Sequence, residues 1–172
     1  MNAEEQVILV DSNDKETGTL GKTEAHKKGL LHRAFSVFIF NEKGEIILQQ
    51  RALDKYHSPG LWTNTCCSHP RSGEEVEEAA HRRLTEEMGF DTKIEKAFDF
   101  IYKHSFGNGL TEHEFDHVYT GIYSGKVNPD PEEVYAWKTI SMDELQKDVS
   151  LNPNHYTIWF KIVLQEFLDK LK

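Results

Sequence analysis

A predicted helix at residues 74–88 carries two charged side chains inside its apolar stripe. The capping-box spacing of Ser72 and Glu75 predicts where this helix begins, and the glycine after residue 88 predicts its end. Arg83 and Glu87 lie within the stripe, and burial of such a pair costs desolvation energy unless another group compensates. A partly buried ion pair and a metal-phosphate site both explain this arrangement. At 100° per residue, the stripe consists of Val76, Ala79, Ala80, Leu84 and Met88.

The rest of the chain mixes strand and helix patterns. A short helix is predicted after Ser141, where Glu144 completes a second capping box, and an amphipathic helix is predicted at residues 156–171. The chain has 172 residues, of which 38% are hydrophobic, and it contains no repeat. We therefore expect a single domain over residues 1–172, of the mixed α/β (α+β) class. Strands are predicted at residues 7–10, 17–20, 34–40, 45–50, 98–102, 114–123 and 135–140.

Composition argues against several classes of partner. The formal net charge is −9, and the chain contains no run of Lys or Arg, so we expect neither a nucleic-acid nor a membrane partner. No apolar stretch approaches the ~20 residues that span a bilayer. Acidic residues stand near the start where a signal peptide carries positive ones, so a cytoplasmic protein is expected. We also expect a monomer or weak homodimer. Cys66 and Cys67 are adjacent, which favours two free thiols over a disulfide.

Three of the nine histidines lie near other candidate metal ligands. His26 and His32 flank a short Lys-Lys-Gly bend, and His69 follows Cys67 in a turn closed by proline. Strand alternation places Glu112 and Glu114 on one face, where two carboxylates repel each other unless a cation lies between them. Three imidazoles and two carboxylates suit Zn²⁺ or Mn²⁺. The ordinary role of a surface or hydrogen-bonded residue is expected for His57, His81, His104, His113, His117 and His155.

Two segments resemble a known enzyme family. The stretches Pro59–Pro70 and Arg82–Phe90 resemble type I isopentenyl-diphosphate isomerases, and the second also resembles the Nudix box. In that register Ser68 occupies the first glycine position, and Arg83 stands where Nudix hydrolases have a glutamate. Loss of that carboxylate argues against pyrophosphate hydrolysis. The resemblance implies a Nudix-like fold, with a mixed sheet flanked by helices, and a small-molecule isoprenoid diphosphate substrate.

The resemblance also implies two metal ions and a binding site for the diphosphate. A Mg²⁺ ion would be bound by Glu87 together with the substrate. One Mn²⁺ or Zn²⁺ ion would be bound by His26, His32, His69, Glu112 and Glu114. The phosphate oxygens would be held by Lys22, Arg51, Lys55, Ser68 and Arg83. These local cations would let an acidic protein bind a polyanion.

The implied reaction is the interconversion of isopentenyl and dimethylallyl diphosphate through a tertiary carbocation. Cys67 and Glu114 would exchange protons from opposite sides of the substrate, and a hydroxyl from Tyr102 would orient Glu114. Trp159 would lie over the developing cation, although a core aromatic on an amphipathic helix is an equally simple interpretation. The alternatives are a Nudix hydrolase acting on a nucleoside diphosphate derivative and a non-enzymatic protein that binds metal or phosphate.

Overall fold

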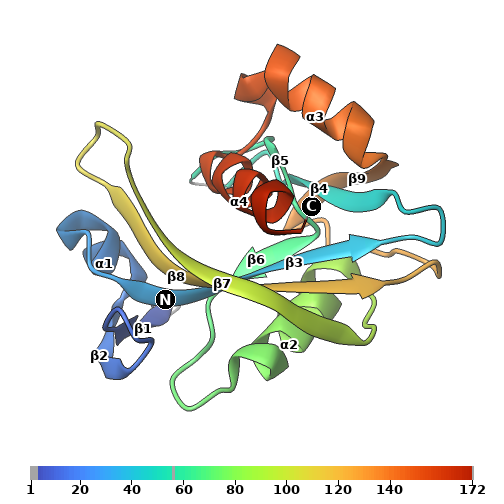
Figure 1. The fold of residues 1–172 in the computed structure, drawn as a ribbon. Coiled ribbons are helices and arrows are strands. Elements are labelled where there is room, and N and C mark those ends of the chain that lie inside the picture. The colour runs from blue at the N-terminus through green and yellow to red at the C-terminus, as the bar shows by residue number, and fades with distance from the viewer. Residues whose placement is uncertain (1–3, 56, 172) are drawn as a thin grey trace.

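Strand β3 (His32–Phe40) lies at the centre of the sheet in the computed structural model, which describes residues 4–55 and 57–171. It pairs in parallel with β8 (Thr111–Ile122) and antiparallel with β1, β4 and β6. Hairpin partners extend the sheet on each side, as Figure 1 shows. The remaining strands are β1 (Gln6–Val10), β2 (Glu16–Gly21), β4 (Ile46–Arg51), β5 (Trp62–Thr63), β6 (Cys66–Ser68), β7 (Ile94–Ser105) and β9 (Val134–Ile140).

Helices cover both faces of this sheet. Helix α2 lies on one face, and α3 and α4 lie on the other (Figure 1). The side chains of β3 alternate between the two sides, so Phe35 and Val37 pack with α2 whereas Phe38 packs with α4. The mixed α/β prediction is thus confirmed. The helical segments are α1 (Lys22–Lys28), α2 (Val76–Met88), α3 (Met142–Leu151), the 3₁₀ turn η1 (Pro153–His155) and α4 (Ile158–Lys170).

The N-terminal hairpin β1–β2 is joined to the main sheet by few contacts. Leu9 and His32 form its backbone pair with β3, and a small apolar cluster lies beneath it. Asp14, at the tip of the hairpin, accepts hydrogen bonds from Arg33 at 2.8 Å and from His117 at 2.9 Å. The hairpin continues directly into α1, which ends at Gly29 in the left-handed conformation. The position of α1 therefore depends on how the hairpin is held.

Several predicted element boundaries differ from the structure. The Ser72 capping box is wrong: the N-cap of α2 is Glu75, and no side chain caps this helix. The Ser141 prediction is confirmed, because its hydroxyl accepts a hydrogen bond from the amide of Glu144. The C-terminal helix begins at Ile158 rather than at residue 156, because Tyr156 pairs with Trp62 in an isolated β-bridge.

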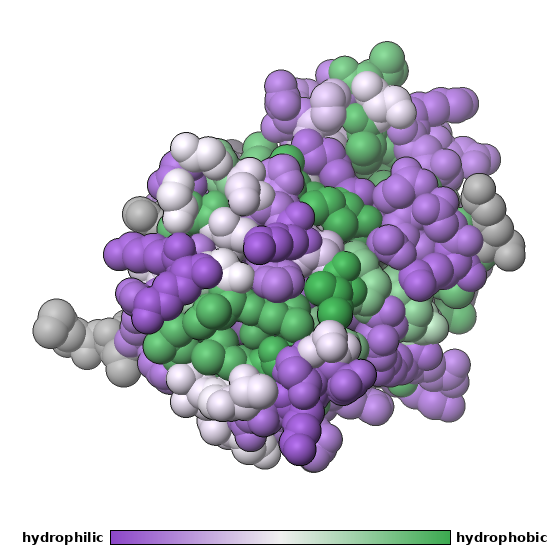
Figure 2. Space-filling view, turned by 60° about the vertical axis from the view of Figure 1, so that its left-hand side comes forward, coloured by the Kyte–Doolittle hydropathy of each residue, from purple (hydrophilic) through white to green (hydrophobic). Residues whose placement is uncertain are grey.

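Surface polarity varies around the molecule. Figure 2 brings forward the side that carries α1 and the N-terminal hairpin, where one hydrophobic patch is bordered by hydrophilic residues. Leu30 and Ile101 are partly exposed large apolar residues, with relative exposures of 37% and 41%. Among the described residues, no helix combines the length and apolar character needed to cross a bilayer.

Candidate active site

A cavity of about 520 Å³ contains most of the predicted site residues. Two do not line it: Tyr102 and His32 contact Glu114 instead, as described below. Segments far apart in sequence meet here, including α1, the start of β8, β6, α2 and α4. The predicted residues that line the cavity are Lys22, His26, Arg51, Lys55, Cys67, Ser68, His69, Arg83, Glu87, Glu112, Glu114 and Trp159.

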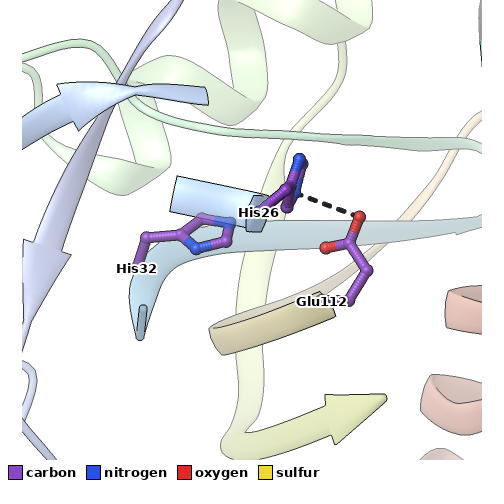
Figure 3. A group of neighbouring side chains, drawn as sticks. All are labelled: His26, His32 and Glu112. Carbon is purple, nitrogen blue, oxygen red and sulfur yellow. Dashed lines mark ion pairs between the residues drawn. The ribbon is translucent and has the colours of Figure 1, made fainter. Parts of the chain in front are cut away.

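Three histidines and two glutamates form a buried cluster at one end of this cavity. Two overlapping groups, each with its ligand atoms within 4.8 Å of one another, share His32. The first group contains His26 and Glu112, whose Nε2 and Oε1 atoms lie 3.2 Å apart (Figure 3). The second contains His69 and Glu114. Parallel pairing of β3 with β8 sets His32 beside Glu114, so the sheet register itself assembles the cluster.

The histidine nitrogens in this cluster suit a metal ion. His32 Nδ1 lies 3.0 Å from the carbonyl oxygen of Leu30, which can only accept, so Nδ1 carries a proton, and in the neutral imidazole Nε2 presents a lone pair. The Nε2 atoms of His26 and His32 are buried and have no hydrogen-bond partner within the described part of the chain. Unsatisfied buried nitrogens are costly, and a divalent cation among them would remove that cost. These groups could therefore hold a metal ion.

Glu114 contacts three side chains, those of His32, His69 and Tyr102. Its Oε2 accepts a hydrogen bond from His69 Nε2 at 2.8 Å, and His32 Nε2 lies 3.3 Å from the same oxygen. Its Oε1 accepts the phenolic hydrogen of Tyr102, the antiparallel neighbour on β7. Burial opposes ionisation, but the contacts with His32 and His69 hold the pKa of Glu114 well below its usual range. Burial raises the pKa of Tyr102, so its phenol keeps the hydrogen that it donates.

The adjacent cysteines point to opposite faces of the sheet. Cys66 pairs with Val37 and its thiol donates to Glu87 on the α2 side at 3.5 Å, whereas Cys67 pairs with Ser36 and lines the cavity. Burial, with the charge of Glu87, raises the pKa of Cys67 to about 12. Its thiol is therefore protonated at neutral pH.

Trp159 contacts the Cys67 thiol from helix α4. Its indole Nε1–H donates a hydrogen bond to Cys67 Sγ at 3.2 Å. The guanidinium carbon of Arg51 lies 5.2 Å from the indole centroid, and the His57 ring meets the indole edge-on at 5.6 Å. The indole is thus held on several sides beside the thiol. Trp159 is therefore not simply a core aromatic of an amphipathic helix, which was the alternative interpretation, because its indole lines the cavity.

Several cations also line the cavity. Arg83 Nη2 lies 3.0 Å from Glu87 on the next turn of α2, so the charged pair within the apolar stripe is a real ion pair on the cavity wall. Burial would lower the pKa of Arg83, but the charges of Glu87 and Glu133 raise it. Arg51 Nε is buried without a hydrogen-bond partner among the described residues. A donor in this state favours an anionic ligand.

Comparison with known proteins identifies the family. The NUDIX domain model matches residues 30–160. Isopentenyl-diphosphate Delta-isomerase 2 of Aromatoleum aromaticum is 50% identical over 96% of this chain and 88% of that protein. The isopentenyl-diphosphate Delta-isomerase of Serratia proteamaculans is 47% identical over 95% of this chain and 91% of that protein. The chain belongs to the Nudix isopentenyl-diphosphate isomerase family.

Solved structures confirm the predicted Nudix-like fold. A Deinococcus radiodurans protein covers 94% of this isomerase-family chain and 98% of its own, with a TM-score of 0.76 and 18% identity. A MutT protein from Methanosarcina mazei covers 83% of this chain and 96% of its own, with a TM-score of 0.66 and 18% identity. At these identities the likeness concerns the fold alone.

Sequence patterns did not indicate several residues that line the cavity of this isomerase-family protein. Glu5 lies 3.7 Å from both Lys22 and His69, and Glu133 contacts two of the cavity cations. His57, expected to have only a surface or hydrogen-bonding role, lines the cavity beside Trp159. The hydrogen-bonded role expected of His117 is confirmed by its contact with Asp14. Neither Glu5 nor Glu133 belongs to a periodic or spaced motif, so only the tertiary fold reveals them.

Proposed function

We propose that this protein interconverts isopentenyl and dimethylallyl diphosphate in isoprenoid biosynthesis, as the names of its relatives indicate for them. The observation that carries the proposal is that one cavity is lined by the Cys67 thiol, by the Glu114 carboxylate bound to His69, and by several cations. A proton added to the terminal alkene carbon produces a tertiary cation, and loss of a proton from C2 places the double bond in its new position. Phosphorus-oxygen bonds stay intact.

Cys67 and Glu114 are assigned to the two proton transfers, one on each side of the five-carbon chain. Both groups line the cavity, where Glu114 is buried and Cys67 is partly buried, and this enclosure would shield the cation from capture by water. Tyr102 is assigned the role of orienting Glu114, because its phenolic hydroxyl donates a hydrogen bond to that carboxyl group. An alkene is a weak base, so the close placement of the acid provides much of the catalysis.

Trp159 is assigned to stabilisation of the cation. Its indole is fixed by the hydrogen bond to Cys67 and by Arg51, so its position beside the thiol is set before a substrate binds. A cation-π contact contributes about 0.5–2 kcal/mol, with the higher value in a dry site. Trp159 therefore assists the proton transfers rather than replacing them.

The cations that line the cavity are assigned to the diphosphate. Arg51 Nε, which has no hydrogen-bond partner among the described residues, supports this assignment, and Glu87 would share a Mg²⁺ ion with the phosphate oxygens. The binding energy of the charged end would position the hydrocarbon that reacts. The assigned ligands of the phosphate oxygens are Lys22, Arg51, Lys55, Ser68 and Arg83, all of which line the cavity.

The histidine-glutamate cluster is assigned to one Mn²⁺ or Zn²⁺ ion. Its residues would be His26, His32, His69, Glu112 and Glu114. When bound, the ion would supply positive charge that favours the ionised form of Glu114 and fixes its position. The buried Nε2 atoms of His26 and His32, which have no hydrogen-bond partner in residues 4–55 and 57–171, support this assignment.

A direct assay separates isomerisation from the two alternatives. The protein is incubated with isopentenyl diphosphate, Mg²⁺ and trace Mn²⁺ or Zn²⁺ in heavy water, and the products are analysed by mass spectrometry and NMR. Dimethylallyl diphosphate carrying deuterium in a methyl group is the expected product. Released phosphate would instead indicate a hydrolase, and unchanged substrate would indicate a binding protein. Arg83, at a position where the hydrolase pattern has a glutamate, weighs against hydrolysis.

We further propose that residues 1–172 work as one domain, as a monomer or weak homodimer in the cytoplasm. The shared sheet beneath both apolar clusters supports one cooperative unit. Two free cysteines support a reducing compartment. The net charge of −9 supports the absence of a nucleic-acid or anionic-membrane partner.

A further inference from the structure

The carboxylate of Glu133 lies among the cations that face the cavity. Its Oε2 lies 2.5 Å from Lys55 Nζ and 3.6 Å from Arg83 Nη2. Glu133 lines the same cavity as both cations. Burial opposes its ionisation, but the hydrogen bond and charge of Lys55 lower the pKa of Glu133, so it is anionic at neutral pH. Two cations assigned to the diphosphate thus already have an internal anionic partner.

Backbone hydrogen bonds hold Glu133 close to the end of α2. Its carbonyl oxygen accepts from the amide of Ala52 at 3.1 Å, and its own amide donates to the carbonyl of Asp130 at 3.0 Å. The amide of Asp130 in turn donates to the carbonyl of Glu87 at 3.0 Å. A Cβ at Gly89 would lie 2.0 Å from the carbonyl oxygen of Asn128, so this loop packs tightly against the end of α2. Glu133 therefore stays near Arg83 when a ligand enters.

Arg83 separates Glu133 from a second carboxylate. The same Nη2 atom lies 3.0 Å from Glu87 Oε2 and 3.6 Å from Glu133 Oε2. If a phosphate drew the guanidinium away, the two carboxylates would repel each other. A divalent cation that arrived with the anion would offset this repulsion, because hard cations bind carboxylate and phosphate oxygens together.

We propose that Glu133 sets the anion specificity of this site by competing with the ligand for Lys55 and Arg83. A monophosphate carries less charge and spans a shorter distance than a diphosphate, so it offsets less of the cost of drawing Lys55 and Arg83 away from Glu133, and it binds poorly. A diphosphate can pair with both, and its metal ion offsets the repulsion between Glu87 and Glu133. Specificity here comes from an unfavourable step imposed on the wrong ligand. This inference rests on the proposed function only in assigning the two cations to a diphosphate.

Calorimetric titration of the full-length protein tests this role. Inorganic phosphate and inorganic pyrophosphate are each titrated with and without Mg²⁺ into the wild type, Glu133→Gln and Glu132→Gln. Glu132 is a matched control, because it carries the same charge on the neighbouring residue and is exposed. Glu133→Gln should bind metal-free pyrophosphate and phosphate about tenfold more tightly, since an internal competitor has been removed. The gain that Mg²⁺ gives to pyrophosphate should shrink. Glu132→Gln should match the wild type.

Unchanged or weaker anion binding by Glu133→Gln, with the wild-type gain from Mg²⁺, would overturn the proposal. Equal tightening by Glu132→Gln would also overturn it, because a general charge effect would then suffice. Glu133→Ala, with thermal unfolding measured alongside, shows whether either result comes from disturbed folding. Turnover of isopentenyl diphosphate is measured separately. A wild type that binds pyrophosphate but forms no dimethylallyl diphosphate would refute the proposed function and leave the result for Glu133 intact.

Discussion

The indole Nε1–H of Trp159 donates a hydrogen bond to the sulfur of Cys67, and the two atoms lie 3.2 Å apart. Helix α4 and strand β6 thereby meet at the group assigned to proton transfer. Trp159→Phe keeps an aromatic face but loses this donor. We expect kcat to fall roughly tenfold with little change in KM, because Phe is a weaker cation-π partner than Trp and no longer fixes the thiol, and both effects bear mainly on the transition state. Steady-state kinetics would show this, and a rise in KM at constant kcat would assign Trp159 to substrate binding instead.

The two adjacent cysteines provide a matched comparison. Cys67→Ala should lower kcat at least about a thousandfold, because it removes a group assigned to proton transfer. Cys66→Ala removes the same atoms on the opposite face of the sheet and should retain most of the activity. Turnover rates and far-UV circular dichroism of both variants give the test. Equal losses in the two variants would mean that the cysteines matter for packing rather than for chemistry.

Tyr102 gives a prediction about positioning. Tyr102→Phe removes the phenolic hydrogen donated to Glu114 and leaves the ring in place. We expect kcat to fall about a hundredfold, since the carboxyl group loses its orientation while the substrate contacts remain. Tyr135→Phe is the control, because Tyr135 is 61% exposed and lies outside the cavity lining. A wild-type kcat in Tyr102→Phe would remove Tyr102 from the mechanism.

The histidine-glutamate cluster predicts metal-dependent stability. Mn²⁺ or Zn²⁺ at about a hundred times its Kd should add roughly 2.7 kcal/mol to the stability of the wild type. That corresponds to a rise in Tm of about 5–11 °C for a chain of this size. His32→Ala should lose most of this rise, whereas His155→Ala, at an exposed histidine outside the cluster, should keep it. Scanning fluorimetry with metal and with chelator would measure both, and an equal rise in both variants would place the ion elsewhere.

Asp14 predicts how the N-terminal hairpin is held. Asp14→Asn should weaken the contacts with Arg33 and His117 and cost about 1–3 kcal/mol in the free energy of unfolding. Amide exchange in β1 and β2 should accelerate more than exchange in β3, because the hairpin has few other contacts with the sheet. Asp91→Asn, at an exposed aspartate paired with His81, is the control. Uniform acceleration across the sheet would contradict a local role for Asp14.

Local patterns identified most elements but not the pairings that assemble the site. The apolar run of β3 and the capping residue of α3 could be recognised because each depends on neighbouring residues. Helix α1 was missed because Lys22–Lys28 has almost no apolar stripe, and its place is set by the hairpin before it. The capping box predicted at Ser72 does not form. Glu74 pairs with Arg82 at 2.8 Å, and the helix starts only after Glu75. Tertiary contacts therefore override these local signals.

The candidate site, too, could be predicted from the sequence only where neighbouring residues determine it. Alternation along β8 predicted that Glu112 and Glu114 share a face, and both do line one cavity. No local pattern places His32 beside Glu114, because their strands are paired in parallel across a long connection. The roles of the ligands came from family resemblance, whereas Glu133 and its cations could be found only in three dimensions.

Cys67 and Glu114 are proposed to act as one catalytic pair on the same substrate. The most direct test compares turnover of isopentenyl diphosphate by Cys67→Ala, Glu114→Gln and the double variant, with folding and metal content checked in each. Each single variant should lose at least about a thousandfold in kcat, and the double variant should be almost no slower, because groups that act as a unit are non-additive. Wild-type-like turnover in either single variant, or losses that multiply in the double variant, would contradict the claim.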